Sequence, residues 1–493
     1  MKNKHYTLGN ICFFISFFLF FFVIWLDVVL GNVYIDKLIF HLLVSQEGTN
    51  YEIILQFLKP FCIATIFFFI FFIQIFKKSP FITINLLKKQ FSFFLFPFRT
   101  KNSKTYLKLS VVVFTIAILF MMIKLQGFQY LKNQITISTF YEEHYVNPND
   151  VKITFPDKKR NLIYIFLESM ETGYSSYKLE NNQVVNLIPN LTNLANANIN
   201  ISNNSNFGGG RQAPATGWTI AAIVAQTAGI NLNIPIDGNS LNNYNIFIPG
   251  VTTIGDILQK EGYNQVFLLG SDSDFGGRKN YFTQHGNYKL YDLNYAKEIN
   301  KIDKDYHVYW GYEDQKLFTY AQEELLRLSQ KSEPFNLTIL TVDTHFYDGY
   351  VDNECELKFE VDYANAINCS DKKIGIFIDW VKQQSFYENT TIILTGDHLT
   401  TNNNFLKENS DRLVYNTIIN SAKTANNIKN REFTILDMFP TTLASMGVNI
   451  EGNKLGLGTN LLSEEKTLIE SLGVDLFERE LSKKSKLYRT FFY

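Results

Sequence analysis

Three long apolar stretches near the start of the chain constrain its fold more than any other feature of the sequence. They cover residues 10–31, 51–76 and 107–126, and phenylalanine is abundant in the first two. A membrane-spanning α-helix needs about 20 apolar residues, which the first two exceed and the third just reaches. The first stretch is too long for the apolar core of a cleaved signal peptide and lacks a small-residue cleavage site. We therefore expect residues 1–126 to form a membrane anchor with about three transmembrane helices.

Basic residues predict the orientation of this anchor. Segment 77–108, between the second and third apolar stretches, contains eight basic residues and no acidic one. Connecting segments rich in lysine and arginine stay in the cytoplasm. Three crossings then place everything after residue 126 outside the membrane. The eight residues are Lys77, Lys78, Lys88, Lys89, Arg99, Lys101, Lys104 and Lys108.

Charge and cysteine content narrow the function classes of the exterior part. The 493-residue chain has a net charge of −1, so no basic field indicates a nucleic-acid partner. Cys355 and Cys369 are the only cysteines after residue 126, so only one pairing is possible there. The extracytoplasmic space permits disulfides, and no zinc-binding spacing is present. We expect a Cys355–Cys369 disulfide.

From about residue 150, short β-branched or aromatic runs alternate with longer helical patterns. This alternation predicts an α/β fold, in which a mostly parallel sheet is covered by helices. We expect a linker over 127–150, a catalytic domain over 151–465 and a charged tail over 466–493. The expected strands are 161–169, 264–271, 335–343 and 390–398, and the expected helices are 251–263, 315–331 and 372–384.

Ionisable residues stand at the carboxyl end of each expected strand, which is where ligands gather in open α/β sheets. They are Glu168, Arg278, His345, Asp397 and His398. Taken singly, each has a plainer explanation, such as a helix cap, a strand-end turn, packing or a surface charge. Independent accidents should not all fall at the same end of the strands, so together they predict a functional site.

Thr216 completes the candidate set. It precedes an apolar helical pattern over 219–229, in which Gly229 is a helix stop signal. Unpaired N–H groups and the positive end of the helix dipole at this point suit a phosphate. The alternative is that Thr216 or Thr219 merely caps the helix. A threonine hydroxyl becomes a competent nucleophile when a metal or base removes its proton.

Glu168, Thr216, Asp397 and His398 together offer three oxygen ligands and one nitrogen ligand. Such a set predicts one divalent metal ion. Carboxylate and hydroxyl oxygens suit Mn²⁺ or Mg²⁺, and the imidazole leaves Zn²⁺ open.

In this order, these residues resemble the alkaline phosphatase and sulfatase superfamily. The similarity covers most of residues 150–465 and is strongest to the branch of lipoteichoic acid synthases and phosphoglycerol transferases, particularly those that act on membrane-derived oligosaccharides. It rests on "FLES", "ATGWTIAAIVAQTAGINL", "LTVDTHFYDGY", "TGDH" and the late "ILDMFPTTLASMGV". The segment "YWGYED" over 309–314 resembles a further motif of the family that has no clear chemical role.

The resemblance implies roles for individual residues. Thr216 corresponds to the nucleophile, and Glu168, Asp397 and His398 to metal ligands. Arg278 and His345 correspond to residues that bind the substrate phosphate. The family often carries tryptophan two residues before the arginine, where this chain has Gly276, which affects recognition of the head group. Thr216-Gly217-Trp218-Thr219 is not the formylglycine context of true sulfatases, which argues against sulfate-ester hydrolysis.

The resemblance implies a metal-dependent transferase in a bacterial inner membrane, with several transmembrane helices and its catalytic domain in the periplasm or outside. It would move phosphoglycerol from a phospholipid to a periplasmic or cell-surface glycan through a phosphothreonine intermediate. A phosphoethanolamine transferase acting on lipopolysaccharide is the main alternative. The donor would then be phosphatidylethanolamine instead of phosphatidylglycerol. A phosphodiesterase and a catalytically dead glycan-binding membrane protein are further alternatives.

Overall fold

The computed structural model describes most of the chain as two compact units. The described residues are 2–30, 35, 37–39, 51–76, 82–86, 89–93, 102–233, 246–345, 348–401, 405–406, 412–425 and 427–493. One unit comprises residues 1–35 and 50–131, and the other comprises residues 36–49 and 132–493. Each unit is described by itself.

The first unit consists mainly of three long helices. They are α1 (Lys2–Leu30), α3 (Tyr51–Phe76) and α4 (Ser103–Lys124), and a short antiparallel pair, β1 (Ile82–Leu86) and β2 (Lys89–Phe93), accompanies them. In the described part of the chain, Lys4–Val28 and Ser103–Lys124 are long and apolar enough to cross a membrane, and most of their surface is exposed. Tyr106 of α4 donates a hydrogen bond to Asn10 of α1. The structure therefore has helices at all three apolar stretches.

A six-stranded sheet forms the centre of the second unit. Its strand order is β11-β10-β4-β9-β7-β8, and all neighbours are parallel except β10 and β11. The strands are β4 (Asn161–Leu167), β7 (Asn264–Leu269), β8 (Lys289–Tyr291), β9 (Phe335–Leu340), β10 (Thr390–Gly396) and β11 (Asn416–Ile419). The predicted α/β class with a mostly parallel sheet is confirmed.

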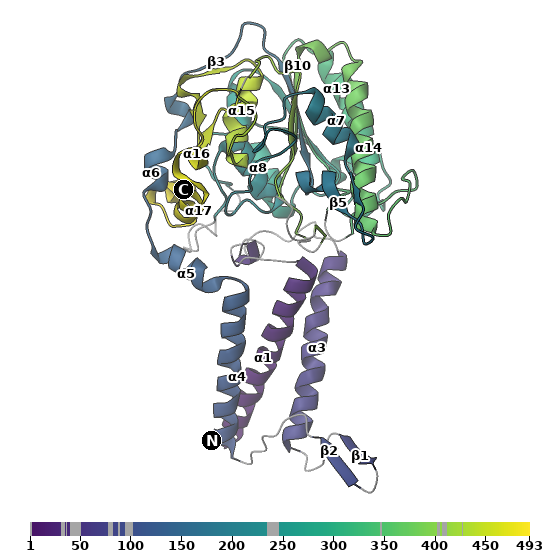
Figure 1. The fold of residues 1–493 in the computed structure, drawn as a ribbon, viewed down its shortest axis with the longest axis vertical. Coiled ribbons are helices and arrows are strands. Elements are labelled where there is room, and N and C mark those ends of the chain that lie inside the picture. The colour runs from purple at the N-terminus through teal and green to yellow at the C-terminus, as the bar shows by residue number, and fades with distance from the viewer. Residues whose placement is uncertain are drawn as a thin grey trace. The chain divides into compact units, whose positions relative to one another are not determined.

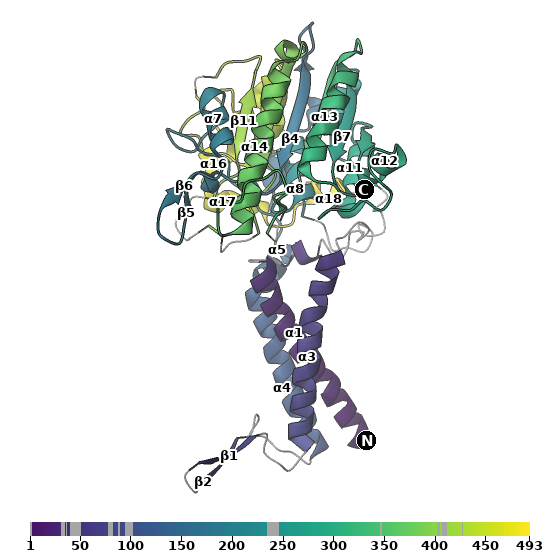
Figure 2. The ribbon, with the colours of Figure 1, turned by 90° about the vertical axis from the view of Figure 1, so that its right-hand side faces the viewer.

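Helices cover both faces of the sheet (Figures 1 and 2). Successive side chains of a strand point to opposite faces, so each face contributes its own set of side chains to a core. Tyr164 and Phe166 pack into a core with α8 (Thr219–Ala228), α10 (Ile254–Lys260), α11 (Arg278–Gln284) and α15 (Met438–Ser445). Ile163 and Ile165 pack into the opposite core with α7 (Pro189–Ala197), α12 (Leu293–Glu298), α13 (Asp314–Ser329) and α14 (Asp362–Lys382). Both faces of β4 are therefore buried.

The remaining helices and strands are short, and one of them, α5, spans the boundary between the two units. The helices are α5 (Gly127–Ile135), α6 (Phe140–His144), α16 (Leu468–Leu472), α17 (Val474–Leu481) and α18 (Lys486–Thr490). The strands are β3 (Ile153–Thr154), β5 (Tyr177–Lys178), β6 (Val184–Val185), β12 (Asn449–Ile450), β13 (Lys454–Leu455) and β14 (Gly458–Thr459). Residues 466–493, expected to be a tail, fold into helices whose Phe477, Leu481 and Tyr488 join the same core as Phe140. The domain boundary at residue 465 stays a prediction.

Candidate metal centre and phosphate site

Three buried side chains meet at the carboxyl ends of two neighbouring strands. Glu168 directly follows β4, and Asp397 and His398 directly follow β10, which pairs with β4 in parallel register. One ligand atom from each residue lies within 4.8 Å of the other two. His398 Nε2 is 3.6 Å from Glu168 Oε1 and 3.4 Å from Asp397 Oδ2. The structure thus brings these three predicted ligands together.

Hydrogen bonding leaves the right atoms available for a cation. His398 Nδ1 lies 2.8 Å from the carbonyl of Leu399, so the proton belongs on Nδ1 and Nε2 carries the lone pair. Asp397 Oδ1 accepts hydrogen bonds from the backbone N–H groups of Ser169 and His398. Asp397 Oδ2 is buried and accepts none from the described residues. A cation between Nε2 and Oδ2 would satisfy both atoms.

Burial also destabilises the charged form of the two carboxylates, and a bound cation would stabilise that form. Burial raises the pKa of Asp397 to about 7. It raises the pKa of Glu168 too, and the charge of Asp397 adds to that effect. Burial lowers the pKa of His398, which favours the neutral imidazole that binds metals. Two carboxylates and a neutral imidazole fit a divalent ion such as Mn²⁺, Mg²⁺ or Zn²⁺.

Small polar residues hold the backbone of Glu168. Its N–H donates to Thr341 Oγ1, and its carbonyl accepts from Thr344 Oγ1. Ser169 donates from its hydroxyl to Glu168 Oε1 and has a positive φ of 53°. A non-glycine residue in this region is uncommon and needs local support. The sequence reasoning missed these supports, because nothing in the pattern links threonines after β9 to Glu168.

Thr216 lies in a tight turn before α8 and does not cap that helix. It is fully buried, and its hydroxyl donates to the carbonyl of Ala213 over 2.7 Å. The helix begins at Thr219, and its N-cap residue, Trp218, makes no side-chain capping hydrogen bond. Ala215, just before Thr216, has a positive φ of 56°. Strained backbone of this kind occurs frequently at functional sites.

Residues on both sides of Thr216 contact the ligand Glu168 or the neighbour of the ligand His398. Gln212 Oε1 accepts a hydrogen bond from the N–H of Leu399, and Thr219 Oγ1 donates to Glu168 Oε2 over 3.4 Å. The sequence pattern indicates only a possible helix cap at Thr219 and does not reveal its contact with Glu168. Thr216 itself makes no hydrogen bond to the three ligand residues.

Arg278 and His345 interact electrostatically with the same centre. Arg278 is buried, which lowers its pKa to about 10, while the charge of Glu168 acts in the opposite direction. Its Nε and Nη2 donate to the carbonyls of Phe275 and Asp272, so the guanidinium is fixed. His345 lowers the pKa of Glu168. A fixed guanidinium and an imidazole that both act electrostatically on Glu168 suit the oxygens of a phosphate.

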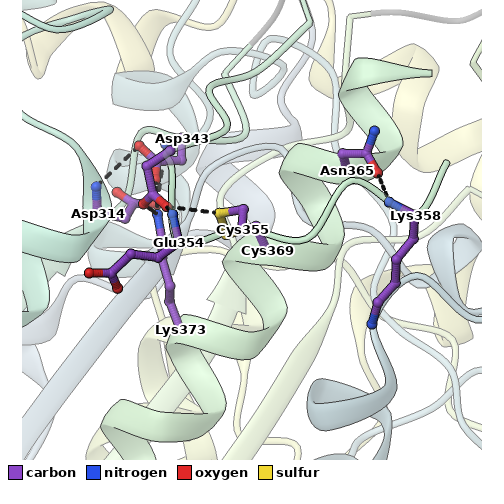
Figure 3. The surroundings of a disulfide bond; sticks show 9 residues. Asp314, Asp343, Glu354, Cys355, Lys358, Asn365, Cys369 and Lys373 are labelled. Atoms are coloured by element: carbon purple, nitrogen blue, oxygen red, sulfur yellow. Dashed lines mark hydrogen bonds and ion pairs between the residues drawn. A yellow bond between two sulfur atoms is a disulfide. The ribbon is translucent and has the colours of Figure 1, made fainter. Parts of the chain in front are cut away.

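The disulfide anchors the segment that follows His345. Cys355 is bonded to Cys369 of α14, as the sequence predicts. On the same helix, buried Lys373 pairs with Asp343, which follows β9, over 2.7 Å and also with Asp352 (Figure 3). Asp343, Asp352 and Cys355 are thus held to α14 by two ion pairs and a covalent bond.

Comparisons with known proteins show which family the chain belongs to. The sequence profile of the sulfatase family matches residues 160–448. The chain belongs to the sulfatase family. Phosphoglycerol transferase I of Escherichia coli (strain 55989 / EAEC) is 31% identical over 344 residues, which are 68% of this chain and 43% of that protein. Phosphoglycerol transferase I of Salmonella choleraesuis (strain SC-B67) is 31% identical over 347 residues, with the same coverage.

A solved structure supports the fold of this family member. The lipoteichoic acid synthase LtaP from Listeria monocytogenes superimposes with a TM-score of 0.50 at 17% identity, covering 64% of this chain and 82% of that one. The alkaline-phosphatase-like fold is therefore shared. The chain spans less than half the length of the curated relatives it matches.

Proposed function

We propose that this chain is a membrane-anchored, metal-dependent transferase. It would take phosphoglycerol from a phospholipid such as phosphatidylglycerol and transfer it to a glycan outside the cytoplasm. The observation that carries the proposal is the buried group of Glu168, Asp397 and His398 next to the Thr216 turn, with two ligand atoms left for a cation. The curated relatives named phosphoglycerol transferase I suggest the head group.

In the first step, the Thr216 oxygen attacks the phosphorus of the donor. A bond forms between this oxygen and phosphorus, the bond from phosphorus to diacylglycerol breaks, and the threonine proton ends on the diacylglycerol oxygen. Before attack, that proton is directed at the carbonyl of Ala213, so the hydroxyl must turn to release it. A bound divalent ion would supply Lewis acidity and favour the alkoxide form of threonine.

In the second step, a glycan hydroxyl attacks the phosphothreonine. The new bond forms between that hydroxyl oxygen and phosphorus, the bond from phosphorus to Thr216 breaks, and the proton of the glycan hydroxyl ends on the Thr216 oxygen. Arg278 and His345 would bind the phosphate oxygens throughout both steps. Because Arg278 is held by two backbone carbonyls, its guanidinium needs little reorganisation when charge develops.

The apolar helices of the first unit support a role at the membrane. With α1, α3 and α4 in a bilayer, enzyme and lipid donor share one membrane. We propose that the anchor crosses the inner membrane three times and that the second unit lies in the periplasm. The same chemistry with phosphatidylethanolamine as donor and lipopolysaccharide as acceptor remains the alternative.

The decisive experiment measures the covalent adduct. Purified full-length protein in phosphatidylglycerol vesicles should release diacylglycerol, and the peptide containing Thr216 should gain the mass of phosphoglycerol. Thr216→Ala should show neither, and Thr216→Ser should retain part of the activity. Thr192→Ala is a matched control, because the Thr192 hydroxyl also donates to a backbone carbonyl but lies on α7.

Three outcomes of this experiment would change the proposal. Wild-type release of diacylglycerol by Thr216→Ala would contradict the nucleophile. If the peptide gains the mass of phosphoethanolamine in vesicles of mixed lipids, the transferred head group is phosphoethanolamine instead of phosphoglycerol. If water hydrolyses the adduct at the same rate with and without the glycan acceptor, the chain is a phosphodiesterase.

A further inference from the structure

The segment 309–314, "YWGYED", is attached to the end of β7. Gly311 forms a β-bridge with Ser271, and the N–H of Tyr312 donates to the carbonyl of Gly270 over 2.9 Å. A Cβ on Gly311 would lie only 2.0 Å from that same carbonyl oxygen. The glycine is therefore required for this close approach. Through it, the segment is hydrogen-bonded to the backbone just before the loop that carries Arg278.

The same segment is attached to the end of β9. Asp314 accepts hydrogen bonds from the N–H groups of Val342 and Asp343. Its own N–H donates to Asp343 Oδ1 (Figure 3). Asp343 lies two residues before His345. The segment thus connects the backbone that carries Arg278 with the backbone that carries His345.

Two aromatic residues of the segment contact His345 directly. The Tyr309 hydroxyl donates to the backbone carbonyl of His345. The ring of Trp310 lies 4.6 Å from the imidazole, centroid to centroid, and 5.4 Å from the ring of Phe275. Phe275 lies 5.4 Å from the guanidinium carbon of Arg278. Aromatic contacts therefore run from His345 through Trp310 and Phe275 to Arg278.

The backbone of Tyr309 is strained in a way that serves these contacts. Its φ is 57°, in the left-handed region that a bulky residue rarely adopts. Such a conformation persists only where the surroundings hold it, and it is frequent at binding and catalytic sites. Here the neighbouring Gly311 and Val308 exchange backbone hydrogen bonds, which closes the turn around Tyr309 and Trp310.

We infer that Tyr309 and Trp310 are positioning residues, which hold His345 at the spacing from Arg278 that one phosphate ester requires. The inference rests on the proposed function only in taking a glycerol phosphate group as the ligand. Tyr309 fixes the backbone of His345, and Trp310 limits the rotation of its imidazole. Loss of either contact should weaken phosphate binding without loss of the metal.

The test uses full-length protein in lipid vesicles and glycerol 1-phosphate as a probe that needs no turnover. Tyr309→Phe removes one hydroxyl and should raise the dissociation constant of the probe about 3- to 10-fold. Trp310→Leu should raise it about 10-fold, and Trp310→Phe should restore most of the affinity, because an aromatic ring remains against His345. The KM for phospholipid should rise in parallel.

Matched controls separate positioning from general stability. Tyr320→Phe removes a hydroxyl that donates to the carbonyl of Lys301, and Trp380→Phe alters a ring on α14 that packs against Phe377. Tm and bound metal should be the same in the Tyr309 and Trp310 variants as in these controls.

Several results would overturn the inference. The inference is wrong if Tyr309→Phe and Trp310→Leu bind the probe as tightly as the control variants do. A loss of Tm and metal that accounts for the whole effect, or the absence of probe binding by the wild type, would also overturn it. Failure of the wild type to release diacylglycerol while probe binding follows the expected order would instead contradict only the proposed function.

Discussion

At the residue scale, each metal ligand can be removed separately. Glu168→Ala, Asp397→Ala and His398→Ala should each reduce metal affinity by more than about 100-fold, since loss of a mere supporting contact already costs 10- to 100-fold. Bound metal per protein, measured by elemental analysis, checks this. Asp397→Ala should also lower Tm most, because Asp397 holds the N–H groups of Ser169 and His398.

A buried carboxylate elsewhere provides the control. Asp371 accepts hydrogen bonds at the start of α7, from the N–H groups of Asn190 and Leu191. Asp371→Asn should lower stability but keep the metal. If any of the three ligand variants kept the metal content of this control, that residue would not be a ligand.

Gln226 is a polar residue inside the apolar helix α8, and its hydrogen bonds explain why a polar side chain is buried there. Its Nε2 donates to the carbonyls of Gly396 and Asp397, and its Oε1 accepts from Tyr164. Gln226→Leu should lower the free energy of unfolding by about 1–3 kcal/mol, because buried polar atoms lose their partners. Urea unfolding measures this.

An exposed position gives the comparison for Gln226. Gln259 lies on the surface of α10, so Gln259→Leu should change stability by no more than about 0.5 kcal/mol. Equal effects of the two substitutions would show that Gln226 does not secure α8 to the strand end.

Residues at the strand ends could be predicted from the sequence, and their supports could not. Glu168, Asp397 and His398 follow apolar runs, so their common location follows from sheet topology alone. Thr219 and Gln226 of α8 contact Glu168 and Asp397, and Thr219 lies 51 residues from Glu168 along the chain. Their contacts depend on how α8 packs on the sheet, which no local pattern contains.

At the element scale, the disulfide joins a long loop to α14. Cys355 and Cys369 are 14 residues apart, and closing such a loop stabilises a protein by about 3 kcal/mol in the chain-entropy model. Cys355→Ser with Cys369→Ser, or reduction of the wild type, should lower the free energy of unfolding by that amount. Chemical denaturation with and without reductant measures it.

The two other cysteines supply the control for the disulfide. Cys12 and Cys62 are free thiols in α1 and α3, so Cys12→Ser with Cys62→Ser should leave the effect of reductant unchanged. A wild type whose stability does not respond to reductant would contradict the stabilising role of the bond.

Central elements were easier to predict than edge elements. The four central strands β4, β7, β9 and β10 are almost entirely buried. Gly229, with a left-handed φ of 64°, terminates α8 as expected. The edge strands β8 and β11 are short and were not predicted. The N-terminal half of α14 was missed as well. Its segment "DYANAINCSD" is rich in polar residues, which hide the helical period.

At the scale of the whole molecule, the charged C-terminal end of the chain contains more regular structure than its composition indicates. The residues after 465 contain many charged side chains, and the sequence predicts only a charged tail there. The structure has helices α16, α17 and α18, whose apolar sides join the core while the charged sides face outward. Amphipathic helices of one or two turns carry too few residues for a periodic pattern to stand out.

The topology of the anchor is the last prediction, and it depends on counting crossings. If α1, α3 and α4 all cross, residue 90 lies in the cytoplasm and residue 150 lies outside, because each crossing changes the side. The eight basic residues in 77–108 favour this arrangement. If α3 does not cross, residues 45 and 90 lie on one side, and residue 150 returns to the side of the N-terminus.

Two kinds of fusion separate these cases. Alkaline phosphatase is active only outside the cytoplasm, and green fluorescent protein fluoresces only inside, because it does not fold after export in the unfolded state. After residue 90 only the fluorescent fusion should work, and after residues 45 and 150 only the phosphatase fusion. Replacing the eight basic residues by glutamine should weaken this preference, since lysine and arginine oppose translocation. Phosphatase activity after residue 90 would place the basic segment outside. The metal centre would then face the cytoplasm, away from any extracytoplasmic glycan, and the proposed acceptor would have to be abandoned.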